Sequence, residues 1–306
     1  MMVLLFLFAF VQLCFGGTLD QAVAARESGD YAGAAALLET VHPLLDPGEE
    51  GRWNLERGLA EDLRWNPAGA EPYYRAAIDI GGDAGMEARY HLAVVLDDLG
   101  RIDEARAELH ALLTASSLNP EFVPVLRIEQ GVIDIHQGRF NRGVHLVQSG
   151  IKRVADPKRH AWMIGRGRFA VLAVQAHRAE QWELRGRDWA DHHALVQRVR
   201  MLKQVEAELF QIIKTEEPEW ITASLLRVGD TYADLADDLA HAPPPAKLTE
   251  DEAAIYTREL AEKANGPRTK AYTLYDHGVA FANRMSWQSP IVDELREKRD
   301  ELSVAR

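Results

Sequence analysis

The sequence predicts an all-α fold built from stacked helical hairpins, and three observations lead to it. Four similar short segments begin at residues 29, 65, 100 and 138, so they recur every 35 to 38 residues. A period of about 34 residues is typical of a repeated helix-turn-helix unit. C-terminal to the last segment, apolar residues still recur every three or four positions, as on one face of a helix. No stretch longer than four residues alternates in the manner of a strand.

Each segment combines a turn residue, a large residue, a small residue and a second large residue at fixed offsets. The four are Gly29-Asp-Tyr31-x-x-Ala34-x-x-x-Leu38, Trp65-Asn-Pro67-x-x-Ala70-x-x-x-Tyr74, Gly100-Arg-Ile102-x-x-Ala105-x-x-x-Leu109 and Gly138-Arg-Phe140-x-x-Gly143-x-x-x-Val147. The glycine suits the left-handed conformation that follows a helix. The small residue lets two helices approach closely, and the last residue faces the neighbouring repeat.

This pattern resembles the tetratricopeptide repeat family over residues 18–157, nearly half of the chain. The resemblance implies a right-handed superhelix of helical hairpins that binds a protein or peptide. Its first helices would line a concave groove, and residues 158–306 would continue the solenoid as longer packed helices. The groove residues predicted from the phase of the repeat are Arg52, Leu55, Glu56, Leu59, Tyr90, His91, Val94, Asp97, Asp98, Ile128, Val132 and Ile135.

Two amphipathic stripes predict the next two helices. The first consists of Leu195, Val199, Leu202, Val205, Leu209 and Ile212, and the second of Ile221, Leu225, Val228, Tyr232, Leu235 and Leu239. Pro218 suits the first turn of the second helix. The strict 3.5-residue period of the second stripe indicates packing against another helix, in the same chain or in a second subunit. Its short length favours a partner helix in the same chain.

The remaining helices are delimited by prolines and a cap. Ala242-Pro-Pro-Pro245 ends one helix, and Thr249-x-x-Glu252 reads as a capping box that opens the next. Asn265-Gly266-Pro267 is expected to break the chain before a further helix over 270–285, and Pro290 begins the last one. The segment 232–287 is similar to envelope tetratricopeptide proteins of myxobacteria and their relatives, including gliding-motility proteins. This similarity implies an exported, partner-binding component without catalytic residues.

The N-terminus has the pattern of a secretory leader. Residues 3–14 are almost all apolar and are followed by Phe15, Gly16 and Gly17, so we expect cleavage after Gly16 or Gly17. An uncleaved anchor and lipidation of Cys14 are the alternatives, and only such an N-terminus would attach the protein to a membrane. Cys14 is the only cysteine, so the cleaved chain would carry no disulfide. The predicted location is the periplasm or cell envelope.

Charge is unevenly distributed. The formal net charge of −12 argues against nucleic-acid binding. The stretch 127–203 nevertheless holds 15 Lys and Arg against 7 Asp and Glu. A basic docking patch for an anionic partner is one interpretation, and a solvated face is the other. The candidate patch residues are Lys152, Arg153, Lys158, Arg159, Arg166 and Arg168. Trp162, Trp182, Trp189 and Trp220 lie in the same region, as core residues or as partner anchors.

Motifs for chemistry are missing from the sequence. The eleven histidines form no H-E-x-x-H pattern. Adjacent carboxylates such as Asp97 and Asp98, or Asp237 and Asp238, do not face each other across a cleft, as glycoside hydrolysis would need. We therefore expect no catalytic, metal or cofactor residues, and we predict a non-catalytic scaffold. The alternatives are a structural subunit that oligomerises through residues 221–239, and a glycan-acting envelope enzyme with its site at residues 160–200.

Overall fold

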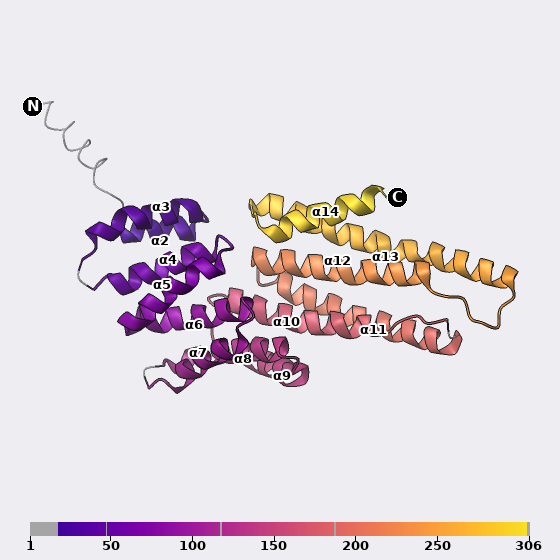
Figure 1. Cartoon of the computed structure of the whole chain (residues 1–306), viewed down its shortest axis with the longest axis horizontal. Coiled ribbons are helices and arrows are strands. Elements are labelled where there is room, and N and C mark those ends of the chain that lie inside the picture. Colours follow the sequence, from indigo (N-terminus) through magenta and orange to yellow (C-terminus); the bar gives the residue numbers. More distant parts are fainter. Residues whose placement is uncertain (1–17, 47, 117, 187, 305–306) are drawn as a thin grey trace, which may run out of the picture. The chain divides into compact units, whose positions relative to one another are not determined.

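The described chain is all-α, as the sequence predicts. The computed structural model describes residues 18–46, 48–116, 118–186 and 188–304. Within these ranges it contains thirteen α-helices and two short 3₁₀ helices, with no strand between them (Figure 1). The predicted leader, residues 1–17, lies outside the described residues. The right-handed superhelix stays a prediction.

The first of two compact units ends at Leu126 and consists of consecutive hairpins. Its helices are α2 (Leu19–Glu27), α3 (Tyr31–Val41), α4 (Glu50–Asp62), α5 (Pro67–Ile80), α6 (Gly82–Asp98) and α7 (Ile102–Thr114), with 3₁₀ helices at His42–Leu44 and Pro120–Phe122. From α2 to α7, consecutive α-helices pack against each other, and α4 also packs against α6. The first unit is therefore a stack of helical hairpins.

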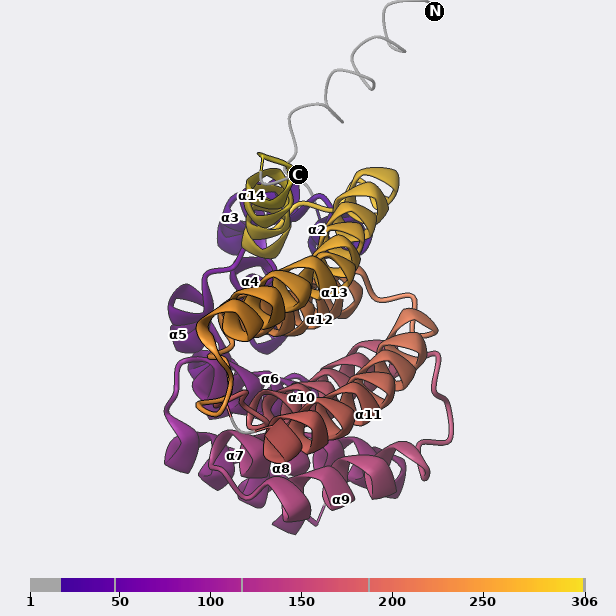
Figure 2. The same ribbon diagram turned by 90° about the vertical axis from the view of Figure 1, so that its right-hand side faces the viewer.

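The second unit begins at Arg127 and uses longer helices. They are α8 (Val123–His136), which starts in the first unit, α9 (Phe140–Ile151), α10 (Ala161–Glu180), α11 (Asp188–Ile213), α12 (Pro218–His241), α13 (Glu250–Met285) and α14 (Pro290–Val304). The pairs α10–α11 and α12–α13 lie side by side (Figure 2). The units divide within α8, whereas we predicted that the repeat array extends to Pro157. The fourth repeat segment therefore belongs to the second unit.

The turn residues of the repeat adopt the left-handed backbone that the sequence predicts. Gly29, Gly100 and Gly138 have φ angles of 88°, 74° and 77°. In the second repeat the equivalent residue is Trp65, which takes the same conformation with a φ of 62°. Left-handed backbone is costly for residues that have a Cβ atom. The conformation is thus a property of the hairpin, and glycine is the residue that adopts it most easily.

The Gly100→Ala substitution should lower the free energy of unfolding by about 1 kcal/mol, because alanine resists a positive φ. The matched control is Gly100→Asn, because asparagine adopts left-handed backbone more readily than alanine. Its loss of unfolding free energy should be clearly smaller than that of Gly100→Ala. Urea unfolding of both variants compares the two losses, and equal losses would contradict the turn assignment.

The small residues of the repeat mark close helix crossings. Ala34, Ala70 and Ala105 are fully buried. In the fourth hairpin, a Cβ added to Gly143 would lie 2.5 Å from the carbonyl oxygen of Gly131, so α8 and α9 touch through their backbones. The fourth hairpin is therefore packed more closely than side chains of any other residue type would allow.

The ends of α12 and the start of α13 match the prediction, but the predicted break inside α13 is wrong. Thr249 and Glu252 form the expected reciprocal capping box. The helix then runs through Asn265-Gly266-Pro267 to Met285 without interruption. A proline inside a helix costs about 3 kcal/mol, and here the packing of α13 along α12 offsets that cost. Ala264 and Ala271, on either side of Pro267, are both buried.

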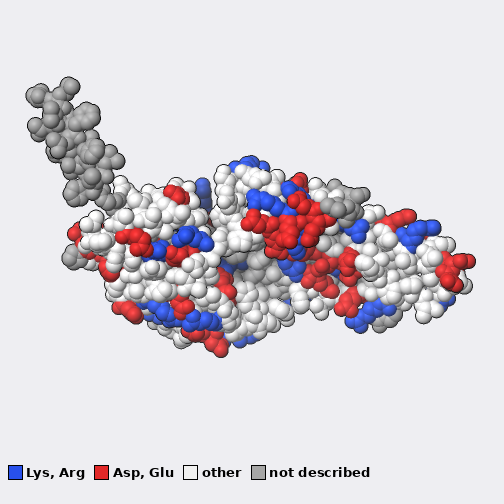
Figure 3. All heavy atoms as spheres, turned by 45° about the horizontal axis from the view of Figure 1, so that its top comes forward, with Lys and Arg blue, Asp and Glu red and all other residues white. Residues whose placement is uncertain are grey.

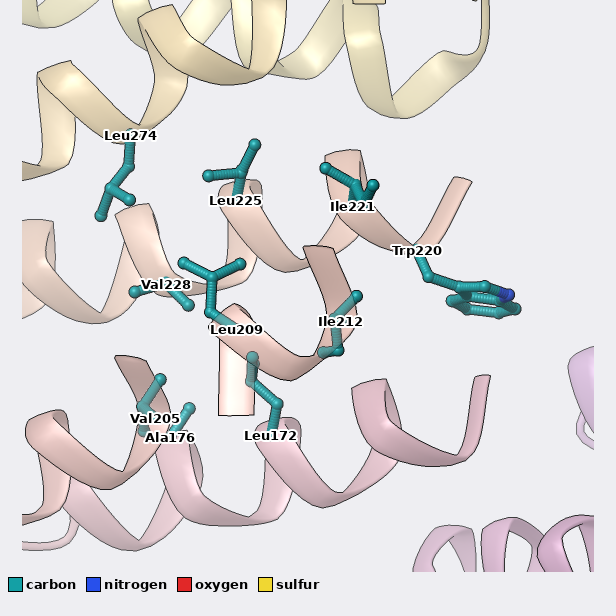
Figure 4. Packing of buried hydrophobic residues seen from close by; sticks show 10 residues of the cluster. All are labelled: Leu172, Ala176, Val205, Leu209, Ile212, Trp220, Ile221, Leu225, Val228 and Leu274. Carbon is teal, nitrogen blue, oxygen red and sulfur yellow. The ribbon is translucent and has the colours of Figure 1, made fainter. Parts of the chain in front are cut away.

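The core of the second unit forms where α10, α11, α12 and α13 meet. Its side chains point toward one another (Figure 4). They are Leu172, Ala176, Val205, Leu209, Ile212, Trp220, Ile221, Leu225, Val228 and Leu274. The apolar stripe of residues 221–239 is thus packed within its own chain, which confirms the in-chain interpretation. Its apolar side chains are therefore not exposed for contact with a second subunit.

One residue of the stripe predicted for α11 is exposed rather than buried. Val199 is 42% exposed, and the preceding residue, Arg198, is buried in its place. The guanidinium of Arg198 pairs with Asp238 of α12. A charged residue occupies this core position because an acidic partner lies opposite it, which an apolar pattern cannot reveal.

Candidate functional surfaces

Most of the residues predicted to line a groove are buried. Nine of them are only 1 to 9% exposed. These nine are Leu55, Glu56, Leu59, Tyr90, Val94, Asp97, Ile128, Val132 and Ile135. Arg52 and Asp98 are exposed, and His91 is partly buried. The phase of the repeat correctly identifies the inward faces of the first helices, but those faces are packed rather than open to a ligand.

Charged groups inside the first unit are held in pairs. The Nε atom of Arg26 donates to Glu56 at 2.7 Å, and Arg57 donates to Glu61 at 2.6 Å. Burial pushes the pKa of Glu61 up, but the amide of Asn66 and the guanidinium of Arg57 outweigh it and lower the pKa. The carboxylate of Glu61 is thus an ionised structural partner of Arg57.

His91 lies in an aromatic cluster between α5 and α6. Its ring stacks on that of Tyr74, with centroids 5.7 Å apart, and meets the ring of Tyr90 edge-on at 5.3 Å. Burial, helped by the charge of Arg26, lowers the pKa of His91 from its usual 6.5 to about 4. At neutral pH the histidine is therefore an uncharged packing residue.

This pKa shift predicts a loss of stability in mild acid. Between pH 6.5 and 4 the unfolded chain binds a proton at residue 91 and the folded chain does not, so the unfolding free energy falls as the pH falls. The contribution lost between pH 7 and pH 5 is about 2 kcal/mol. His91→Phe, which keeps the ring, should remove this part of the pH dependence in urea unfolding. The exposed His110→Phe is the control, and identical pH profiles for His91→Phe and the wild type would refute the assignment.

The predicted basic patch loses two of its six members. Lys152, Arg153, Lys158 and Arg159 are exposed around the α9–α10 connection. Arg166 is only 5% exposed and pairs with Glu129, whose exposed fraction is 1%. Arg168 is partly buried, and its Nη1 donates to Glu208 at 2.7 Å. Both arginines sit on the inward side of α10, where carboxylates of neighbouring helices attract them.

Arg166 is the centre of a buried aromatic and acidic cluster. Its Nε atom lies 3.1 Å from Oε2 of Glu129 on α8. Its guanidinium carbon lies 6.0 Å and 5.9 Å from the ring centroids of Trp162 and Trp220. Trp162 in turn donates through Nε1 to Glu219 of α12 at 2.8 Å. The cluster therefore links α8, α10 and α12.

The sequence leaves open whether the central tryptophans are core residues or anchors for a partner, and the structure places them differently. Trp220 is buried and meets the rings of Trp162 and Phe169 with centroids 5.3 and 5.6 Å apart. Trp162 and Trp182 are partly buried. The side chain of Trp189 lies outside the described residues. For Trp220 the core interpretation is confirmed.

The adjacent carboxylates do not converge. Asp238 pairs with Arg198, while Asp237 points to His241, 3.0 Å away. The described residues hold no group of three or more His, Cys, Asp or Glu side chains placed to bind a metal ion. Among the described helices, none has both the length and the apolar character needed to cross a bilayer.

The outer face of α14 carries an acidic strip that the sequence analysis did not single out. A shallow hollow of about 540 Å³ runs along it, lined by Pro290, Asp293, Glu294, Glu297, Lys298 and Glu301. Acidic atoms gather over this helix (Figure 3). Lys298 is turned toward Asp230 of α12, 2.7 Å away, so it ties α14 to the unit and leaves the strip acidic.

A second surface that sequence reasoning missed is a row of exposed apolar side chains on α11. Val196, Val199, Phe210 and Ile213 are 49, 42, 67 and 41% exposed. Their spacing places them on one face of the helix. The signal in the sequence is a second apolar stripe, shifted by one residue from the buried one. We call residues 196, 199, 203, 206, 210 and 213 the outer row.

No protein-family model and no curated protein matches the chain. The resemblance to tetratricopeptide repeats therefore stays a prediction from the sequence.

Proposed function

We propose that the protein is a non-catalytic scaffold that binds a partner protein, and that it works in a bacterial cell-envelope assembly. The observation that carries this proposal is the outer row of α11. Four large apolar side chains lie exposed on one helix face, in a unit whose other apolar stripes are buried. Aligned apolar side chains of this kind are typical of protein-binding surfaces. The leader pattern and the resemblance of residues 232–287 support the envelope location.

The interior of the second unit favours a scaffold over the enzyme alternative. An enzyme site at residues 160–200 would need a cleft with converging carboxylates. There, α10 instead buries Leu172 and Ala176 in the apolar core (Figure 4). Arg166 of the same helix forms an ion pair with Glu129. The exposed cations Lys152 and Arg153, with Lys158 and Arg159, remain the proposed docking site for an anionic partner.

Photo-crosslinking in the cells that make the protein tests the proposal. A photoreactive amino acid replaces Phe210 in the outer row or, as the matched control, Ile255, which is 47% exposed on α13. We expect protein adducts from position 210 and few or none from position 255. Absence of protein adducts from position 210, or equal adducts from both positions, would contradict a scaffold that acts through α11.

A further inference from the structure

Helix α11 carries two parallel rows of residues with the same spacing. The buried row consists of residues 195, 198, 202, 205, 209 and 212, of which the first is partly buried and the other five are buried. On this side α11 packs against α10 and α12. The outer row is shifted by one residue along the helix. Successive members of both rows are separated by 3, 4, 3, 4 and 3 residues, which is the spacing of a helix-packing seam. The buried row has its partner helices in the same chain, and the four large apolar members of the outer row remain exposed.

The spacing of the outer row reads the same from either end. An antiparallel copy of α11, turned about a two-fold axis between Gln204 and Val205, therefore places every member opposite another member. Val196 then faces Ile213, and Val199 faces Phe210. Such self-complementarity is what a two-fold interface between identical chains requires.

Charge decides the orientation. In the antiparallel alignment Lys203 of each copy faces Glu206 of the other. Lys203 is exposed. Glu206 uses Oε1 to accept from Tyr232 and to pair with Lys270, both at 3.0 Å, so its Oε2 stays available. A parallel alignment would instead set lysine against lysine and glutamate against glutamate, which is unfavourable.

We propose that the outer row of α11 is an antiparallel self-association surface whose occupant is a second copy of this chain. The inference rests on the proposed function, because it names the partner of the same surface. The paired segment of 18 residues is about 27 Å long. One helix pair of this length lies at the small end of specific interfaces. The dimer should therefore form at micromolar rather than nanomolar concentrations.

Cysteine crosslinking tests both the association and its direction. The full chain carries Cys14→Ser, which removes its only native thiol, together with Val196→Cys and Ile213→Cys, and is treated with a short bifunctional thiol reagent. We expect the double variant to form covalent dimers with a yield at least about tenfold above either single variant, because residues 196 and 213 meet only across the two-fold axis. Adding Phe210→Glu should abolish the yield. Both cysteine sites are exposed, so the fold should be retained, and circular dichroism checks this.

Three outcomes would overturn the proposal. Efficient crosslinking of Val196→Cys alone would indicate a parallel pair. Equal yields with and without Phe210→Glu would place the contact elsewhere. A monomer throughout sedimentation equilibrium, up to several hundred micromolar, would exclude self-association. If position 210 still crosslinked to a different protein in cells, the scaffold function would stand and only the identity of the partner would be wrong.

Discussion

Arg166→Met is expected to lower the free energy of unfolding by about 3–5 kcal/mol, which is the usual cost of removing one partner of a buried ion pair. The substitution leaves the carboxylate of Glu129, which is 1% exposed, without its arginine. It also removes the guanidinium from the rings of Trp162 and Trp220. Because the cluster joins three helices, the loss should affect the whole second unit. Urea unfolding followed by tryptophan fluorescence measures it.

The double variant Arg166→Met with Glu129→Leu separates charge from packing. With both charges removed, the unfolding free energy should recover most of the loss, since an apolar pair of similar volume often replaces a buried ion pair at little cost. If the double variant were as unstable as the sum of the two single variants, the two residues would not act as a pair. A cost below about 1 kcal/mol for Arg166→Met alone would show that the guanidinium is solvated.

Gly131→Ala is the second substitution with a large expected effect, a loss of about 2–4 kcal/mol from overpacking. The new Cβ would lie 2.7 Å from the carbonyl oxygen of Gly143 and 2.8 Å from the backbone nitrogen of Val147. Both neighbours are backbone atoms, so α8 and α9 would have to move apart. Thermal unfolding of Gly131→Ala and of the wild type measures the effect, and equal midpoints would contradict the close crossing.

The repeat segments predicted the hairpins of the fold because local chemistry determines them. A left-handed turn residue, a small residue at the crossing and a large residue after it each act within one hairpin. Gly100, Ala105 and Leu109 show all three. Pro267 marks the limit of this reasoning, because the packing of α13 on α12 outweighs a local helix breaker.

The candidate sites were less predictable, because exposure depends on partners far away in the sequence. Arg166 reads as a surface cation until Glu129 is placed beside it, 37 residues away. Arg198 is buried and Val199 is exposed, the reverse of what their side chains suggest, because Asp238 pairs with Arg198 from α12. The inward faces of the first helices were identified correctly, but whether they line a groove or a core depends on how closely the hairpins pack.

The central claim is that the protein acts through the outer row of α11. Its most direct test is to measure the self-association of Phe210→Glu and of Ile255→Glu by sedimentation equilibrium. Both substitutions place a carboxylate at an exposed apolar position, so both variants should unfold at the same urea concentration as the wild type. We expect Phe210→Glu to weaken association roughly thirtyfold or more, as for a central interface residue, and Ile255→Glu to leave it unchanged. Equal association constants for the two variants, or a large loss of stability in Phe210→Glu, would contradict the account.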